Sequence, residues 1–130
     1  MPRPPILPMV EWRKIFFAAT EFPVWLESAE HSSHRDEMVR GLELVSIEPI
    51  VHELLLSLKR PVHVVAIAED WCGDVVRHVP VLERLAGVGT NLITRYISRE
   101  AHPEVFARYL TNGGEAIPKF IFLNHDFVEC

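Results

Sequence analysis

The feature that most constrains this sequence is an apolar run, Val62 to Ala68, that leads almost directly into Trp71-Cys72-Gly73-Asp74. The run is rich in β-branched residues, which is typical of a strand buried on both faces of a parallel sheet. Residues 73–86 follow with apolar side chains at helical spacing. We therefore expect a cysteine to lie between a buried strand and the first turn of a helix.

Helical and extended patterns alternate around this strand. Apolar residues at helical spacing predict a helix over 47–58, with its apolar face made by Ile47, Ile50, Val51, Leu54, Leu55 and Leu58. The other predicted elements are strands over 92–97 and 117–123, a helix over 103–110 and, after a turn at 124–126, an extended run over 127–130. This order predicts an α/β fold with a mixed, mostly parallel sheet flanked by helices.

The first 46 residues have a different character. Residues 1–9 read as an extended, proline-restricted arm, and helices are predicted over 10–20, 23–30 and 34–44. Ser33 and Asp36 resemble a capping box that would open the last of these helices. We expect residues 1–46 to form an arm and a helical extension, and residues 47–130 to form the main domain within a single folded unit.

Composition excludes several classes of protein. The chain has 130 residues, of which 48% are hydrophobic and 24% charged, as in an ordinary globular domain. Its formal net charge of −5 disfavours nucleic-acid binding. No apolar run reaches the roughly 18 residues of a membrane helix, and the N-terminus does not read as a signal peptide. We expect a cytoplasmic protein without membrane association.

Cys72 is the residue that we expect to carry chemistry. Backbone N–H groups at a helix N-terminus favour a thiolate, which is the nucleophilic form of cysteine. The alternative is that Cys72 is only a small buried hydrophobic residue, as free cysteines often are. The two cysteines, Cys72 and Cys130, are too few for a disulfide scaffold, and we expect both to be reduced thiols. The histidines and cysteines do not form a recognisable metal-ligand set, so no metal or cofactor is predicted.

The segment Ala68-Glu69-Asp70-Trp71-Cys72-Gly73-Asp74 resembles the active-site segment of the thioredoxin superfamily, in a bacterial branch with a helical N-terminal extension. Pro80 is similar to the proline that kinks the active-site helix of that family. Ile117-Pro118-Lys119 is similar to the motif that holds its cis-proline. The resemblance covers roughly residues 47–130 and implies a thioredoxin-like fold with Pro118 in the cis form beside Cys72.

The sequence departs from the family pattern at three points. The second active-site cysteine of the family would fall at Val75, and its buried proton-accepting aspartate at Ala66. The helix that follows the last hairpin in the family is missing or truncated here, because the sequence ends at Cys130. A dithiol reductase needs a second thiol to release its mixed disulfide, so Cys72 alone implies monothiol exchange.

The resemblance implies a set of site residues and partners. Cys72 would be the nucleophile, and Trp71, Gly73, Asp74, Ile117 and Pro118 would contact the substrate. Two readings remain open: thiol–disulfide exchange at Cys72, and a non-catalytic module that binds peptides or proteins. Asp74 also fits a plain first-turn carboxylate, and Trp71 a packing role. Expected partners are protein or peptide thiols and disulfides, with glutathione a candidate reductant, and the protein is a monomer or a homodimer.

Overall fold

The computed structural model describes residues 10–98, 101–102, 105 and 117–130, and its centre is a three-stranded sheet. The strands are β1 (Val62–Ile67), β2 (Leu92–Ile97) and β3 (Lys119–Leu123), in the order β2-β1-β3. β1 runs parallel to β2 and antiparallel to β3, so the sheet is mixed. The arm over 1–9 and, apart from residue 105, the helix expected over 103–110 lie outside the described residues.

Five described helices surround this sheet: α1 (Trp12–Ala18), α2 (Phe22–Glu27), α3 (Ser32–Leu44), α4 (Pro49–Leu56) and α5 (Gly73–Ala86). All five were expected from the sequence, and α1, α2 and α4 are shorter than their periodic patterns. Pro23 lies in the first turn of α2, and Pro49 begins α4. Proline is tolerated at these positions because the N–H groups of a first turn have no partner within the helix.

The central strand is buried on both faces, as its composition predicts. Val64, Val65 and Ala66 are all fully buried. On one face, the side chains of Thr94 and Tyr96 reach α5. On the other face, Phe16 of α1 packs against His63. Residues from α1, α3, α5 and all three strands join one hydrophobic cluster, so the N-terminal helices and the sheet share a core.

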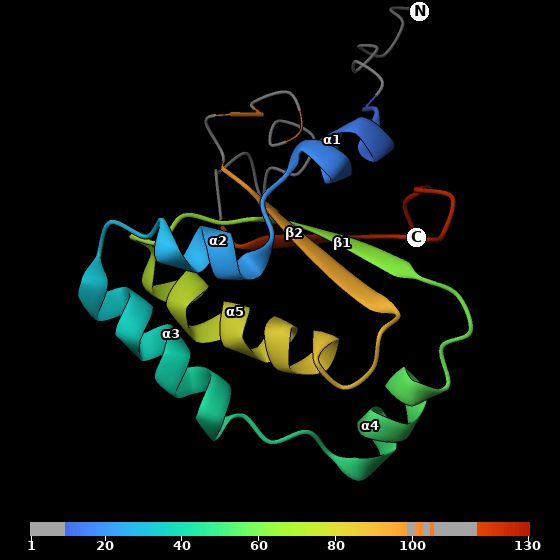
Figure 1. Cartoon of the computed structure of the whole chain (residues 1–130), viewed down its shortest axis with the longest axis horizontal. Helices are drawn as coiled ribbons and strands as arrows, with labels where there is room; N and C mark the ends of the chain where they lie inside the picture. The colour runs from blue at the N-terminus through green and yellow to red at the C-terminus, as the bar shows by residue number, and fades with distance from the viewer. Residues whose placement is uncertain (1–9, 99–100, 103–104, 106–116) are drawn as a thin grey trace, which may run out of the picture.

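Helix α3 runs alongside α5, and the two pack closely where Gly41 meets Pro80 (Figure 1). A Cβ atom added at Gly41 would lie 3.0 Å from Cγ of Pro80. Pro80 is inside α5, where its ring removes one backbone N–H from the helix. Glycine at position 41 therefore allows the backbone of α3 to approach the proline ring on α5.

The N-terminus of α3 corrects the sequence-based expectation of a capping box. The helix begins at Ser32 and its N-cap residue is His31, which makes no side-chain capping hydrogen bond. Ser33 therefore lies inside the first turn rather than before it. The backbone N–H of His31 instead donates to the carboxylate of Asp70, 2.9 Å away.

The apolar face expected on the helix over 47–58 is only partly covered, because Ile47, Val51, Leu55 and Leu58 are half-buried while the other two residues of the face are exposed. No residue of α4 is buried, and Ile50 and Leu54 are 65% and 62% exposed. Helix α4 stands apart from α5 at the lower right of Figure 1. The periodicity correctly predicts a helix, but a helical period does not reveal whether another element covers its apolar side.

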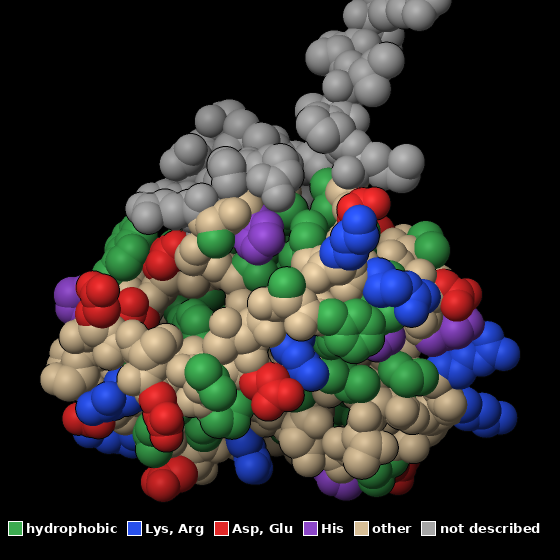
Figure 2. All heavy atoms as spheres, turned by 45° about the horizontal axis from the view of Figure 1, so that its top comes forward, with side chains coloured by type: hydrophobic (Ala, Val, Ile, Leu, Met, Phe, Trp, Pro, Cys, Tyr) green, Lys and Arg blue, Asp and Glu red, His purple; other side chains and the backbone are tan. Residues whose placement is uncertain are grey.

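The surface in Figure 2 mixes charges of both signs. Acidic and basic side chains alternate across this face, with hydrophobic side chains scattered between them. Over the described residues, no helix combines the length and the apolar character that crossing a bilayer requires.

Candidate functional site

Cys72 is the N-cap residue of α5, at the point where the chain turns from β1 into the helix. Its carbonyl oxygen accepts the N–H of Val76 at 3.2 Å, and its own N–H donates to the carbonyl of Glu69 at 3.3 Å. The side chain is partly buried against the hydrophobic core. The thiol thus lies at a helix N-terminus, in the position that the sequence predicts.

The loop before β3 lies beside this thiol. Sγ of Cys72 lies 3.9 Å from the carbonyl oxygen of Ile117, although 45 residues separate them in the sequence. The peptide bond between Ile117 and Pro118 is cis, the isomer that the resemblance implies. The structure therefore brings Cys72 together with Ile117 and its neighbour Pro118, which were singled out as one site.

The residues that flank Cys72 differ in their surroundings. Trp71 is 49% exposed, so half of its indole surface is open to solvent. Asp74 forms an exposed ion pair with Arg77 one turn further along α5, which fits a first-turn carboxylate. Gly73 begins α5, and a Cβ atom added there would meet nothing within 4 Å. A substrate role for these three residues stays a prediction.

The structure keeps other thiols away from Cys72. Val75 and Ala66, at the positions of the family's second cysteine and buried aspartate, are both fully buried apolar residues. Cys130 donates its backbone N–H to Phe122, which pairs with Val64 near the start of β1. Cys72 follows the opposite end of β1. A disulfide needs Cα atoms within about 7 Å, so Cys130 cannot pair with Cys72 in this fold.

The segment before Cys72 is tied to α3 by two hydrogen bonds. The carboxylate of Asp70 accepts the N–H of His31, and Nδ1 of His34 donates to the carbonyl oxygen of Asp70 at 2.7 Å. The N-terminal extension thus holds the loop that carries Trp71 and Cys72. Sequence reasoning missed this link, because the bonded residues are more than 35 positions apart.

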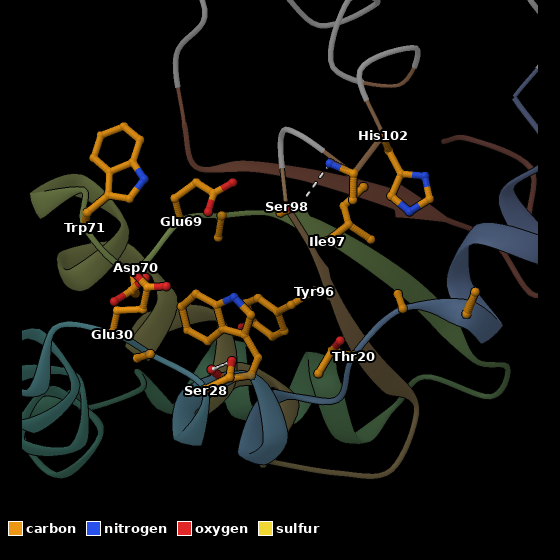
Figure 3. Close-up of a pocket in the computed structure, with 16 residues that line it drawn as sticks. Thr20, Ser28, Glu30, Glu69, Asp70, Trp71, Tyr96, Ile97, Ser98 and His102 are labelled. Atoms are coloured by element: carbon orange, nitrogen blue, oxygen red, sulfur yellow. Dashed lines mark hydrogen bonds between the residues drawn. The ribbon is translucent and has the colours of Figure 1, made fainter.

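A cleft of about 510 Å³ opens on the other side of this loop, as Figure 3 shows. It lies at the carboxyl ends of β1 and β2, the common place for ligand sites in α/β sheets. Helix α2 and the loops around it form the opposite wall. The side chains that line the cleft are those of Thr20, Trp25, Ser28, Glu30, Glu69, Asp70, Trp71, Tyr96, Ile97, Ser98 and His102, together with five alanines. Trp71 lines the cleft, and Cys72 is the next residue along the chain.

Three partly or fully buried polar side chains, Glu83, Tyr96 and Thr94, are hydrogen-bonded together, and Tyr96 lines the cleft. The hydroxyl of Tyr96 donates to Oε2 of Glu83 at 2.6 Å, and Thr94 donates to the same oxygen at 2.8 Å. Burial raises the pKa of Glu83, an effect that these two hydrogen bonds only partly oppose. Burial, and then the nearby charge of Glu83, raise the pKa of Tyr96, so its hydroxyl stays protonated. On the cleft side, Trp25 stacks on the Tyr96 ring with 4.8 Å between ring centroids.

Within the described residues, no group of three or more His, Cys, Asp or Glu side chains converges to hold a metal ion. The site combines a thiol at a helix N-terminus, a backbone carbonyl beside it and a polar cleft lined by Trp71. A thiol at a helix N-terminus is a candidate nucleophile.

Comparisons with known proteins agree with the fold. The family model Thioredoxin_9, described as thioredoxin, matches residues 19–130. No curated protein matches the sequence. A crystal structure of a protein of unknown function from Pseudomonas aeruginosa superposes with a TM-score of 0.81 at 17% identity, covering 93% of this chain and 74% of that chain. An HIV epitope scaffold superposes with a TM-score of 0.79 at 19% identity, covering 92% and 74%. At these identities, both structures show the fold alone.

Proposed function

The chain belongs to the thioredoxin family, and from this membership we propose that it is a monothiol protein that carries out thiol–disulfide exchange through Cys72. We also propose that its Trp-Cys-Gly-Asp segment marks a branch of the superfamily with one active-site cysteine. Its partners would be thiols and disulfides of proteins or peptides in the cytoplasm, with glutathione a candidate reductant.

The observation that carries this proposal is the position of Sγ of Cys72 at the start of α5, 3.9 Å from the carbonyl oxygen of Ile117. The helix N-terminus favours negative charge on the sulfur. The backbone of residues 117 and 118 offers polar groups to an extended peptide, in the manner of strand addition. A substrate sulfur docked there lies next to the nucleophile.

The exchange proceeds in two steps. In the first step, the Cys72 thiolate attacks one sulfur of a substrate disulfide, and a bond forms between them. The substrate disulfide breaks, and its other sulfur leaves as a thiolate that takes a proton from solvent. In the second step, an external thiolate attacks the substrate sulfur of the mixed disulfide. A disulfide forms between these two sulfurs, and the Cys72 sulfur leaves as a thiolate. The external thiol is required because position 75 holds valine.

One observation favours a second candidate function, a binding module without redox activity. Val75 and Ala66 are fully buried apolar residues at the two positions that the family uses for dithiol chemistry. A chain that retains only the backbone edge at Ile117 and Pro118 would still bind extended peptides. The two candidates differ in whether Cys72 reacts.

The test measures which cysteine exchanges with a small disulfide. The Cys130→Ser variant is incubated with oxidised glutathione, and mass spectrometry follows the mixed disulfide on Cys72. We expect one glutathione per chain, formed at least tenfold faster than on the same protein unfolded in urea and returned to thiol by added glutathione.

The matched control is Cys72→Ser, which keeps the exposed thiol of Cys130. We expect this variant to react no faster than its unfolded form. If folding does not accelerate the reaction of Cys72, the redox proposal is wrong and the binding module is the better account.

A further inference from the structure

The loop between β1 and Cys72 is held by the N-terminal extension at one residue, Asp70. The first turn of α3 binds Asp70 at two points: the carboxylate accepts the backbone N–H of His31 at 2.9 Å, and the carbonyl oxygen accepts a hydrogen bond from Nδ1 of His34 at 2.7 Å. Figure 3 shows the side chains of Asp70 and Trp71 pointing to opposite sides of the loop. Two hydrogen bonds to one residue fix both its position and the orientation of its carbonyl group.

The two histidines contribute to this link in different ways. A carbonyl oxygen only accepts hydrogen bonds, so Nδ1 of His34 must carry the hydrogen that lies between the ring and Asp70. The side chain of His34 is half-buried, whereas that of His31 is exposed. His31 reaches Asp70 through its backbone N–H, which any residue except proline provides. Only at position 34 does the link depend on the side chain.

A short turn connects Asp70 to the thiol. The N–H of Cys72 donates to the carbonyl oxygen of Glu69 at 3.3 Å, which closes the turn over residues 69–72 with Asp70 inside it. Cys72 is also the N-cap residue of α5, and its carbonyl oxygen accepts the N–H of Val76 at 3.2 Å. The place of the sulfur at the start of α5 therefore depends on the backbone of a turn that α3 holds at Asp70.

We propose that His34 is a positioning residue, which keeps the thiol of Cys72 in its reactive place through the carbonyl group of Asp70. The inference rests on the proposed function and adds how the same site is controlled by the N-terminal extension. Without the bond from His34, the turn is free to rotate, and the sulfur moves away from the N–H groups of α5 that favour a thiolate. Because the thiolate is the reactive form of cysteine, the reactivity of Cys72 falls.

The test removes the donor at position 34 and then restores it. His34→Leu has no side-chain donor, whereas His34→Asn carries an amide N–H close to the place of Nδ1. Every protein in the comparison is the full chain with Cys130→Ser, so Cys72 is its only cysteine. The rate of alkylation by iodoacetamide reports on the thiol. We expect His34→Leu to react about fivefold more slowly than the parent, as loss of one hydrogen bond implies, and His34→Asn to recover most of the rate.

His31→Leu is the matched control, because it makes the same substitution three residues earlier and keeps the backbone N–H that reaches Asp70. It should react at the rate of the parent. Amide hydrogen exchange separates a local effect from a general loss of stability. In His34→Leu, the amide of Cys72 should exchange at least fivefold faster, while that of the fully buried Val65 in β1 stays as in the parent. Should His34→Leu fail to fold, His34→Ala takes its place with the same expected results.

The outcomes distinguish this proposal from the proposed function, because alkylation requires no disulfide chemistry. A slow His34→Leu variant of a chain that does not exchange with oxidised glutathione supports the positioning role and contradicts the redox function. Exchange at Cys72 in the parent, with alkylation in His34→Leu as fast as in the parent or faster, does the reverse. An equal loss of rate in His31→Leu, no recovery in His34→Asn, or faster exchange at Val65 as well as Cys72 also overturns the positioning role.

Discussion

The carboxylate of Asp70 lies 2.9 Å from the backbone nitrogen of His31 and accepts its hydrogen bond. Helix α3 has no side-chain cap at its own N-terminus. Asp70 supplies a negative charge and an acceptor there from 39 residues away, next to the loop that holds the thiol. The N-terminal extension and the loop that carries Cys72 therefore stabilise each other.

Replacement of Asp70 by alanine tests this link. We expect Asp70→Ala to lower the free energy of unfolding by about 1 kcal/mol, as loss of a helix cap does. Asp70→Asn keeps an acceptor oxygen and should cost less. Urea denaturation of the purified variants measures both values. Ser33→Ala is the matched control, because Ser33 lies inside α3 and should change stability by less than about 0.5 kcal/mol. A larger loss in Ser33→Ala than in Asp70→Ala would show that capping is local after all.

Glu83 predicts a dependence of stability on pH. Burial raises the pKa of Glu83 in the folded chain above its ordinary value of 4.5, so the folded state binds this proton more tightly than the unfolded state. Its contribution is fully present below pH 4.5 and is lost as the pH rises through the raised pKa. Glu83→Gln keeps an acceptor for Tyr96 and Thr94 but cannot ionise. We expect the parent protein to lose stability relative to Glu83→Gln as the pH rises from 4 to 7.

Urea midpoints of the two proteins across this pH range check the expectation. Other groups titrate in both proteins, so only the difference between the two curves reports on Glu83. Parallel curves would mean that the environment of Glu83 is the same in the folded and unfolded states.

Val75→Cys tests whether the site beside Ile117 and Pro118 still accepts disulfide substrates. Position 75 lies in the first turn of α5, three residues after Cys72, where side chains are neighbours. The parent protein should reduce insulin with dithiothreitol barely above background, because it lacks a resolving thiol. Val75→Cys should give a clear gain, at a cost of about 1 kcal/mol in packing. The rate stays modest because Ala66 provides no proton acceptor.

The control for this gain is Cys72→Ser in the Val75→Cys background, which should abolish it. A Val75→Cys protein that folds, forms the disulfide between residues 72 and 75 and still reduces no insulin would favour the binding module.

The contact between Gly41 and Pro80 predicts the effect of a single methyl group. Alanine at position 41 would gain helix propensity of up to about 1 kcal/mol. However, its Cβ atom would press on the buried and rigid proline ring at 3.0 Å, and such overpacking costs roughly 1–3 kcal/mol. We expect Gly41→Ala to be destabilising by about 1 kcal/mol.

Gly73→Ala is the comparison, because its Cβ atom meets nothing within 4 Å and the residue begins α5. It should leave stability unchanged or raise it slightly. Thermal denaturation of both variants gives the two values. A rise in melting temperature for Gly41→Ala would mean that α3 can move away from α5 at little cost.

Local patterns in the sequence predict much of the fold. The buried strand β1 and the amphipathic helix α5 follow from composition and periodicity, and they place Cys72 at a helix N-terminus. The proximity of Ile117 follows from the resemblance to thioredoxins and not from any local pattern. The strand and the helix are each predicted from residues close in sequence, so neither prediction needs knowledge of tertiary contacts.

Features that depend on distant partners were missed. The carboxylate of Asp70 replaces the local cap expected at Ser33, and the apolar face of α4 is only partly covered although it has a helical period. Glu83 lies among polar residues of α5, and nothing near it in sequence indicates the strand hydroxyls that it meets. The cleft escaped notice because half of its wall comes from α2 and its loops, which the sequence places in a separate extension.

The close approach of α3 to α5 at Gly41 has an evolutionary consequence. Proline at position 80 restricts position 41 to glycine, since a Cβ atom at 41 would lie 3.0 Å from the ring. Substitutions at the two positions should therefore occur together among related chains. A lineage that replaces Pro80 with a smaller residue becomes free to carry alanine or serine at position 41.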